Sequence, residues 1–578
     1  MINLLNFFEQ PSSSRQKQYE AIRAIIVEKM TYDKAAKKYG YKTGTLYTLV
    51  REAKAGRLNL FPEVKIGPQK RRTKESVCKQ IIDYRTTNNL SAQDILQEFK
   101  KANINISVRT IERILSEAGF EKLKRRTFKE RGITLKNKEV PSRATHLDFE
   151  NLDPFSVDCP TAGIFFFLPY ILDFKIMDVV QNCKLPSSSD IGSTQACLAM
   201  LALKLMGQER LSHIENYDKE PGLGVFAGLN VLPKKTYMNT YSCRGSEDML
   251  NNFQQKILGK FMDTTPELYG GDYINLDFHS VPHYGDQSEM EKIWCGSKHK
   301  AMKGANTVFA QDSKNNMILY TRADILRKEE AQEIKKFVDY WKSLKKDIKE
   351  TLVFDCKFTK YTVLNDLNND DIKFITLRKR NAKLLKEIDS VSDGKWQKVH
   401  VNIPKRKYKK VKVYESEVLL NKCDKPFRQL IVKDNGRDNP AVIITNNKEL
   451  SIKDVLIVYA KRWRVEKKIA ELVAFFNLNA LSSPLMIRIH FDILWTFIAD
   501  SLYHYFAQDL RRFEHHDAKT LFRKFINMPG RIVYDGENFI LKIRKRAHTP
   551  VLKSILKLQQ PITVPWLNNK KLEIVWTA

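Results

Sequence analysis

Apolar strand-like runs alternate with a helical stretch between residues 270 and 377, and this alternation constrains the fold most strongly. The runs are YINLDFHSV at 273–281, MILYTRADI at 317–325, LVFD at 352–355 and KFITL at 373–377, and a helical pattern covers about 328–346. Strands that alternate with helices predict an α/β layer fold. Asp277 and Asp355 follow the apolar parts of two of these strands, so we expect both side chains at strand ends, where they can converge.

The rest of the 578-residue chain is too long to share that one core, because a domain usually holds about 100 to 200 residues. We therefore expect a multidomain protein with helical N-terminal units, an α/β core, a β-rich insertion and a mixed C-terminal segment. The predicted boundaries are 1–66 and 67–140 for two helical units, 141–265 for a helical connecting region, 266–380 with 447–510 for the core, 381–446 for the insertion and 511–578 for the C-terminal segment.

Positive charge is concentrated in two parts of the chain. Lys and Arg number 98 against 67 Asp and Glu, which leaves a formal net charge of +31. Residues 1–140 hold 30 basic and 15 acidic side chains, and residues 377–440 hold 18 and 8. Such clustering favours a polyanionic partner, although a solvated surface or a membrane-surface patch remains an alternative.

Cysteines and apolar runs indicate the compartment. None of the eight cysteines forms a C-x-x-C pair or a zinc-like spacing, which favours a reducing cytoplasm. The first residues lack the pattern of a signal peptide. The most apolar stretch, at 164–174, is too short for a membrane span and contains Pro169 and Asp173, so we expect it to be buried core.

The N-terminal 140 residues contain two similar helical patterns. In the first, Thr31 is a candidate N-cap, and Ala36 with Gly40 fits the close turn of a helix-turn-helix. In the second, Ser91 and Ser107 are candidate caps after a basic linker. Such units place one helix in the major groove of DNA, and a plain helical hairpin is the alternative. The candidate DNA-binding residues are Thr45, Tyr47 and Thr48 in the first unit and Arg109, Thr110 and Arg113 in the second.

A third acid lies on the helix expected after Ser451. Tyr459, Arg462 and Glu466 are spaced by three and then four residues, so they share one helix face. Polar groups on a face next to apolar residues need partners. The simpler alternative is a surface salt bridge between Arg462 and Glu466.

These motifs together resemble the DDE transposases of the cut-and-paste insertion-sequence group. The resemblance rests on Y459-A-K-R462-W-R-V-E466, on D277-F-H279 and on LVFD355-C-K-F358. It implies a ribonuclease H-like core in which Asp277, Asp355 and Glu466 bind two Mg²⁺ ions, with Mn²⁺ able to substitute. It also implies that Tyr459 and Arg462 orient Glu466 and contact phosphate, with His279 nearby.

The resemblance further implies the partners of the protein. These are double-stranded DNA, as terminal inverted repeats and as target DNA, and a second copy of the chain in the DNA complex. A bacterial protein of this kind would work at the nucleoid in the cytoplasm and without a membrane. Two classes compete with a transposase: a non-catalytic DNA-binding regulator, and a nuclease of the same fold that does not join strands.

The chain departs from the family pattern at two positions. Phe278 stands where the family often has glycine after the first aspartate, and Val473 stands where the signature lysine is expected, seven residues after the glutamate. Lys467 or Lys468 can supply the missing phosphate-binding lysine, and the sequence leaves both open.

Residues 381–446 predict a β-rich insertion. Strand-like runs such as YKKVKVYES and AVIITNN are separated by Gly, Pro, Asn and Asp. Lys405, Arg406 and Lys407 suit a phosphate track, or else protect an edge strand. Trp396 is the candidate for stacking on an unpaired base. Near the C-terminus, Asp535-Gly536 predicts a hairpin turn.

Overall fold

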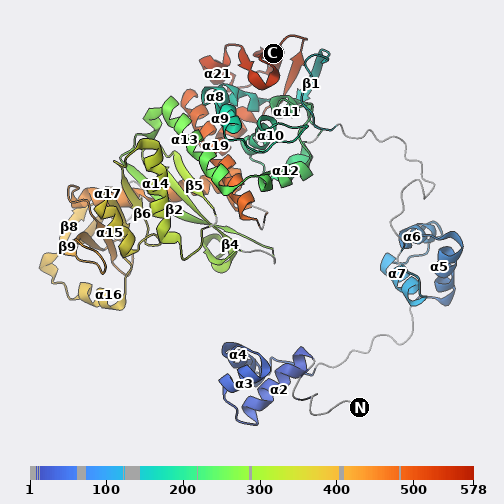
Figure 1. The fold of residues 1–578 in the computed structure, drawn as a ribbon, viewed down its shortest axis with the longest axis horizontal. Helices are drawn as coiled ribbons and strands as arrows, with labels where there is room; N and C mark the ends of the chain where they lie inside the picture. Colours follow the sequence, from blue (N-terminus) through green and yellow to red (C-terminus); the bar gives the residue numbers. More distant parts are fainter. Residues whose placement is uncertain are drawn as a thin grey trace. The chain divides into compact units, whose positions relative to one another are not determined.

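The computed structural model divides into two compact units, Met1–Lys138 and Glu139–Ala578 (Figure 1). The described residues are 8, 11, 13–61, 73–121, 123, 143–217, 219–285, 290–323, 325–402, 409–480, 483 and 485–578. The prediction of a helical N-terminal part followed by a sheet-rich region is confirmed.

The smaller unit contains two three-helix groups. The first has α2 (Ser14–Ile26), α3 (Tyr32–Tyr39) and α4 (Thr43–Lys54), and the second has α5 (Glu75–Asn88), α6 (Ala92–Lys101) and α7 (Val108–Glu117). Each has its own small apolar core. Gly40 ends α3 with a φ of 61°, the left-handed conformation that glycine adopts without strain. Ser91 begins α6 with a capping box, and Ser107 caps α7.

The helical part of the larger unit is arranged around two buried helices, α10 (Ser193–Leu205) and α19 (Met486–Asp509). Surrounding helices are α8 (Leu168–Asp173), α9 (Ile176–Asn182), α11 (Pro221–Phe226), α12 (Lys235–Tyr241) and α13 (Glu247–Thr264). The stretch from Ile164 to Phe174 is almost wholly buried, apart from Leu172 and Asp173, which confirms the prediction of core. Among the described residues, no helix has both the length and the apolar character to cross a membrane.

The largest sheet has ten strands and provides the framework of the site. Its first part contains β2 (Tyr273–Pro282), β3 (Lys292–Cys295), β4 (Lys300–Asp312), β5 (Ile318–Arg322), β6 (Thr351–Phe354) and β7 (Phe374–Leu377). β2 is antiparallel to β4 and parallel to β6, and β6 is parallel to β7. Two helices connect these strands along the chain. α14 (Glu333–Lys345) lies between β5 and β6, and α15 (Tyr361–Asn369) lies between β6 and β7.

Residues 382–445 continue this sheet. They contain α16 (Ala382–Asp389), β8 (Gln397–His400), β9 (Lys410–Val418), β10 (Phe427–Lys433) and β11 (Ala441–Thr445). The strands follow β7 in the order β11, β10, β9, β8. The segment therefore adds strands to the edge of the core sheet, because β11 pairs with β7 in antiparallel register.

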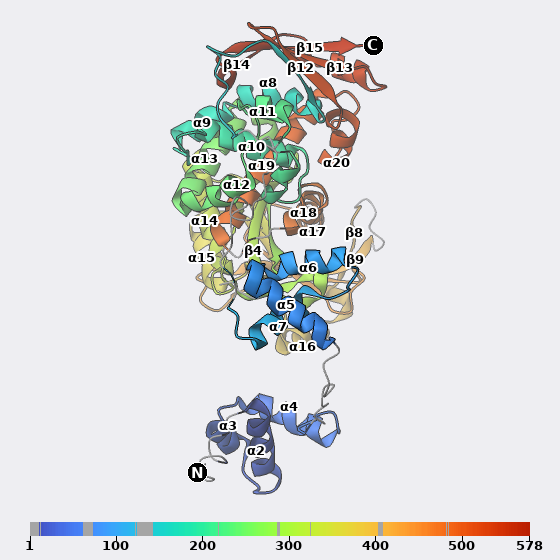
Figure 2. The same ribbon diagram turned by 90° about the vertical axis from the view of Figure 1, so that its right-hand side faces the viewer.

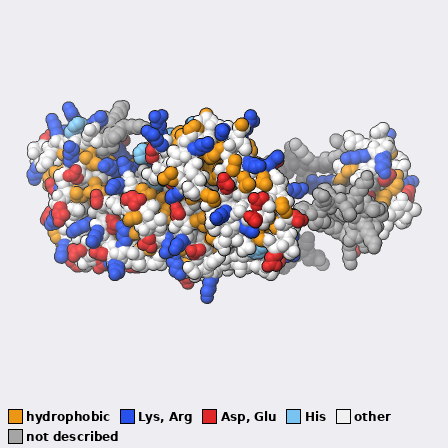
Figure 3. All heavy atoms as spheres, turned by 90° about the horizontal axis from the view of Figure 1, so that it is seen from above, with side chains coloured by type: hydrophobic (Ala, Val, Ile, Leu, Met, Phe, Trp, Pro, Cys, Tyr) orange, Lys and Arg blue, Asp and Glu red, His pale blue; other side chains and the backbone are white. Residues whose placement is uncertain are grey.

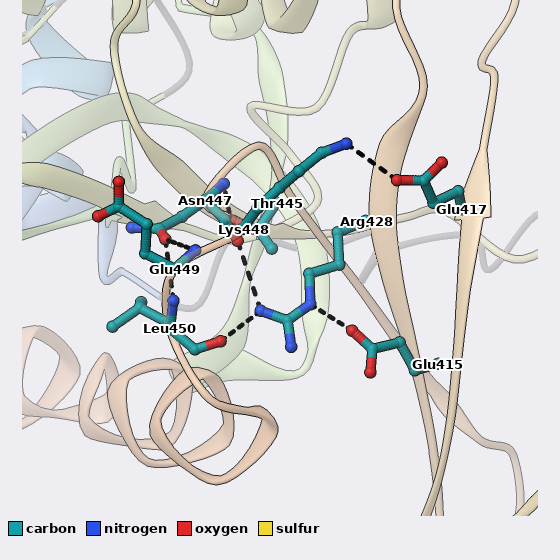
Figure 4. A network of polar contacts seen from close by, with 8 residues as sticks. All are labelled: Glu415, Glu417, Arg428, Thr445, Asn447, Lys448, Glu449 and Leu450. Atoms are coloured by element: carbon teal, nitrogen blue, oxygen red, sulfur yellow. Dashed lines mark hydrogen bonds and ion pairs between the residues drawn. The ribbon is translucent and has the colours of Figure 1, made fainter.

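A polar network fixes the turn that leads out of β11 (Figure 4). The Arg428 guanidinium on β10 donates to the Glu415 carboxylate and to the backbone carbonyl of Leu450. The Asn447 side chain accepts from the backbone N–H groups of Glu449 and Leu450. This turn immediately precedes α17 (Ile452–Lys461), so the network sets where that helix begins.

A five-stranded sheet closes the other end of the unit (Figure 2). Its strands run in the order β1 (Phe155–Cys159), β12 (Gly530–Tyr534), β13 (Phe539–Arg544), β15 (Lys570–Thr577) and β14 (Ile562–Val564). The predicted turn lies between β12 and β13, where Gly536 has a φ of 101°. Within residues 141–265, predicted as a helical connecting region, β1 is a short strand whose partner β12 lies 371 or more residues away along the chain.

Candidate active site

Asp277 and Asp355 lie at the same edge of the large sheet. The pairing of β2 with β6 ends at Leu276 opposite Phe354, and each aspartate is the next residue. β2 itself continues to Pro282, paired only with β4. Asp277 is therefore inside a strand rather than at its end, which corrects the expectation, but it stands where its neighbouring strand stops.

The helix that carries Glu466 has a break at Arg462. α17 ends at Lys461 and α18 (Trp463–Phe476) begins after it, whereas the sequence predicted one continuous helix. The Arg462 guanidinium donates to Asp277 Oδ2 at 3.0 Å and to Glu466 Oε1 at 2.5 Å. The Arg462–Glu466 pair is therefore part of a larger arrangement, since the guanidinium joins α18 to β2.

Electrostatic coupling connects all three acids. Burial raises the pKa of Asp277 to about 6, Arg462 opposes that rise, and the charges of Asp355 and Glu466 add to it. Burial likewise raises the pKa of Tyr459 to about 12, with a further rise from Asp355. The side chains of Asp277 and Arg462 are only 13 and 14% exposed, whereas Glu466 is 43% exposed.

The donor set suits a hard divalent cation. Among the described residues, no three acid, histidine or cysteine side chains are already arranged as a metal site, and Arg462 occupies the space between two of the acids. Carboxylate oxygens are the ligands that Mg²⁺ prefers. Burial first, and the charges of Asp355 and Glu466 second, raise the pKa of Asp277; a bound cation would favour the charged carboxylate against both effects, so the residues fit such an ion.

Comparison with known proteins identifies this region. Residues 271–501 match the family described as transposase DDE domain. The chain contains a transposase DDE domain.

Similar solved structures include two transposase complexes. A piggyBac transposase synaptic complex with hairpin DNA is 11% identical, with 65% of this chain and 82% of that chain covered and a TM-score of 0.37. A Mos1 transposase paired-end complex with the left transposon end is 8% identical, with 63% and 77% covered and a TM-score of 0.13. At these scores the likeness supports no argument about this chain. No curated protein matches it in sequence.

The DDE domain accommodates Phe278 by aromatic stacking. The Phe278 ring stacks on Phe358 with centroids 4.0 Å apart, which ties the strand of Asp277 to the loop after Asp355. Lys357 Nζ lies 6.0 Å from the Phe278 ring. Lys357 was not predicted as a site residue, although its position two residues after Asp355 was a signal. His279 Nε2 lies 2.6 Å from Asn479 Oδ1, and burial lowers the pKa of His279.

The two candidate lysines of the DDE domain differ in their surroundings. Lys468 is buried and forms an ion pair with Asp500 at 2.8 Å. Lys467 is 64% exposed and lies 3.4 Å from Glu471. A cation held in a buried pair cannot reach a phosphate without breaking it, so Lys467 is the better candidate. Both lysines line a cavity of 380 Å³ together with Lys461, Arg464 and the exposed Trp463, so exposure rather than the cavity separates them.

The predicted DNA-binding residues lie in varied environments. Thr45, Tyr47, Thr48, Arg109 and Arg113 are exposed, and Thr110 is half-buried beside its cap. Tyr47 stacks on Tyr32, and Arg113 lies 3.8 Å from Glu117. Lys405, Arg406 and Lys407 lie outside the described residues.

Trp396 is less accessible than its predicted role, stacking on an unpaired base, requires. Its ring is half-buried against an apolar cluster that includes Ile388, and the Lys433 ammonium lies 4.6 Å from the ring centroid. Stacking of a base on Trp396 would therefore require Lys433 to move aside.

Proposed function

We propose that this protein is a DNA transposase that binds terminal inverted repeats, cleaves the DNA at the element ends and joins the strands to target DNA. The observation that carries the proposal is the link from Asp277 through Arg462 to Glu466, with Asp355 within electrostatic reach. The three acids are 78 and 111 residues apart along the chain, and acids that served only to solvate the surface would not need to come together.

The proposed roles follow from the geometry. Asp277, Asp355 and Glu466 would hold two divalent ions, Mg²⁺ or Mn²⁺, which stabilise the attacking and leaving oxygens of phosphoryl transfer. Arg462 neutralises the acids before metal arrives, and its donors can then turn to a DNA phosphate. Tyr459, whose ring centroid lies 5.9 Å from the Arg462 guanidinium carbon, positions that side chain.

DNA binding is proposed for the smaller unit and for the surface of the larger one. The two three-helix groups suit helix-turn-helix readers of the element ends, with α4 and α7 as recognition helices. On the face drawn in Figure 3, Lys and Arg side chains are spread among acidic ones. Bringing two ends together implies a homodimer in the DNA complex.

The sheet order supports the ribonuclease H-like assignment of the core. β2 is central, with the antiparallel β4 and β5 on one side and the parallel β6 and β7 on the other. Both aspartates then follow the last paired residues of β2 and β6, although β2 stays paired with β4 beyond Asp277.

Cleavage and strand joining on the DNA that flanks the coding region test the proposal. Asp277→Asn and Asp355→Asn are expected to abolish both reactions in Mg²⁺ and leave binding of that DNA intact. Cleavage without joining by the unaltered protein would assign a nuclease, and binding without either reaction would assign a regulator.

A further inference from the structure

A two-stranded ribbon extends beyond the part of the sheet that carries the acids. β3 pairs with the first residues of β4 in antiparallel register, from Lys292 opposite Lys303 to Cys295 opposite Lys300. Its base is fixed, because the Gly304 N–H donates to the Glu291 carbonyl and the Arg327 N–H donates to the Glu291 carboxylate. The ribbon therefore has a defined orientation relative to β2 and β4.

The two faces of this ribbon differ sharply. Ile293 and Cys295 point to the buried face, being 5 and 0% exposed. Trp294 lies on the other face and is 61% exposed. Its cross-strand neighbour is Ala301, whose methyl group is too small to cover an indole ring. Among the described residues, no ring stacks on Trp294 and no cation lies over it.

The ribbon is also strongly basic. Residues 290–304 contain four lysines, at 292, 298, 300 and 303, and a single acid, Glu291, which already accepts a backbone hydrogen bond. Lys292 and Lys300 are exposed. Lys298 Nζ lies 5.7 Å from the ring of Tyr284, a second exposed aromatic side chain beside the ribbon. Exposed aromatic rings among lysines suit nucleic acid, which offers both phosphates and apolar base edges.

We propose that the β3–β4 ribbon is a DNA-binding arm that enters the major groove of duplex DNA next to the cleavage site. The major groove, about 12 Å wide, admits a two-stranded ribbon. Lys292 and Lys300 contact phosphates, and Trp294 contacts base edges in the groove. The inference rests on the proposed function only for the position of the cut; binding of duplex DNA by the ribbon is independent of catalysis.

The register gives the distance between the arm and the acids. Asp277 is opposite Phe309 of β4, and Trp294 is opposite Ala301 of β4. The two pairs are therefore eight residues apart along β4. At about 3.3 Å per residue this is at most about 26 Å. Because duplex DNA rises about 3.4 Å per base pair, the arm contacts DNA within about eight base pairs of the scissile phosphate.

Binding measurements with the full-length protein test the arm. The probes are a mixed-sequence duplex and a duplex of the same length that carries the cleaved sequence. Trp294→Ala is expected to weaken binding to both by about fivefold or more, because the exposed indole ring would no longer bury apolar surface against the groove. The double variant Lys292→Gln/Lys300→Gln is expected to reduce the slope of log K against log salt by about 1.8, since each phosphate contact contributes about 0.9.

Matched controls come from the C-terminal part of the chain. Leu556→Ala removes an equally prominent apolar side chain, 82% exposed, and Lys553→Gln removes an exposed lysine; neither is expected to change affinity or slope. Thermal unfolding of each variant should match the unaltered protein, because the altered side chains make few packing contacts. A Trp294→Phe variant should restore most of the affinity.

Protection of guanine N7 from methylation locates the arm, because N7 lies in the major groove. Protection within about eight base pairs of the cut, lost in Trp294→Ala, is the expected result. Unchanged affinity and salt slope in all ribbon variants would overturn the proposal, and so would a Trp294→Ala variant that loses self-association but keeps its DNA affinity. If the protein cuts nothing, the mixed-sequence duplex still decides whether the ribbon binds DNA.

Discussion

Replacing Glu466 by Gln separates catalysis from stability, because α18 offers a matched control. Glu466 is paired with Arg462 and Glu471 is paired with Lys467, so each glutamate lies four residues after its cation. Both side chains are partly exposed, and pairs of this kind contribute about 0.3 to 0.5 kcal/mol. The unfolding entropy of the larger unit is about 0.9 kcal/mol/K, at about 2.1 cal/mol/K per residue, so either variant should shift the unfolding midpoint by less than about 1 °C.

The two variants should differ in activity. Glu466→Gln removes a proposed metal ligand, and since even residues that support a ligand contribute about 10- to 100-fold, we expect a loss of cleavage of more than about a hundredfold. Glu471→Gln changes the same charge on the same helix and should retain cleavage within about twofold, since it faces Lys467 rather than Asp277. Cleavage rates at several Mg²⁺ concentrations and thermal unfolding of both variants provide the data. Equal activity of the two variants would refute the assignment of Glu466.

Three further predictions concern other parts of the molecule. Burial lowers the pKa of His490 to about 4. Because the histidine of the unfolded chain binds a proton from about pH 6.5 downward, the free energy of unfolding should be full above pH 6.5 and fall by up to about 1.4 kcal/mol per pH unit toward pH 4. Denaturant titrations at pH 7 and pH 5 should show a smaller fall for His490→Gln. Lys468→Met should destabilise the protein by about 3 to 5 kcal/mol because it leaves Asp500 buried without its partner. Lys467→Met should keep the free energy of unfolding within about 0.5 kcal/mol and reduce cleavage. Loss of cleavage without loss of stability in Lys468→Met, with Lys467→Met unaffected, would make Lys468 the phosphate ligand. The Met1–Lys138 unit expressed alone should bind the element ends with an affinity that falls steeply with salt, and equal affinity for any duplex would exclude it as the reader of the ends.

Much of the framework could be predicted from local patterns. Capping residues Ser91, Ser107 and Ser451 begin helices as expected, because a cap depends on neighbours within three residues. The strands that carry Asp277 and Asp355 could also be predicted, since a buried strand is a continuous apolar run.

Features that depend on distant partners could not be predicted in the same way. The contact of Arg462 with Asp277 joins residues 185 apart, and helical spacing could reveal only its contact with Glu466. Lys467 and Lys468 looked equivalent because the burial of Lys468 is decided by Asp500 on another helix. The sequence pointed to Trp396 and gave no reason to consider Trp294, since only the packing around each ring shows which of the two is exposed.

The attachment of β11 to β7 has a consequence for how the active site assembles during folding. The chain runs through β8, β9 and β10 and returns to β7 as β11 before it reaches α17, so the helices that carry Arg462 and Glu466 start beside β7, after the turn that Arg428 secures. Closing such long-range pairings is slow, because the chain loses entropy before the contacts form. Strands β8, β9, β10 and β11 are consequently needed to place the helices that follow them. We therefore expect a chain that lacks residues 382–445 to lose the proposed cleavage activity, because β11 and its turn set where α17 begins.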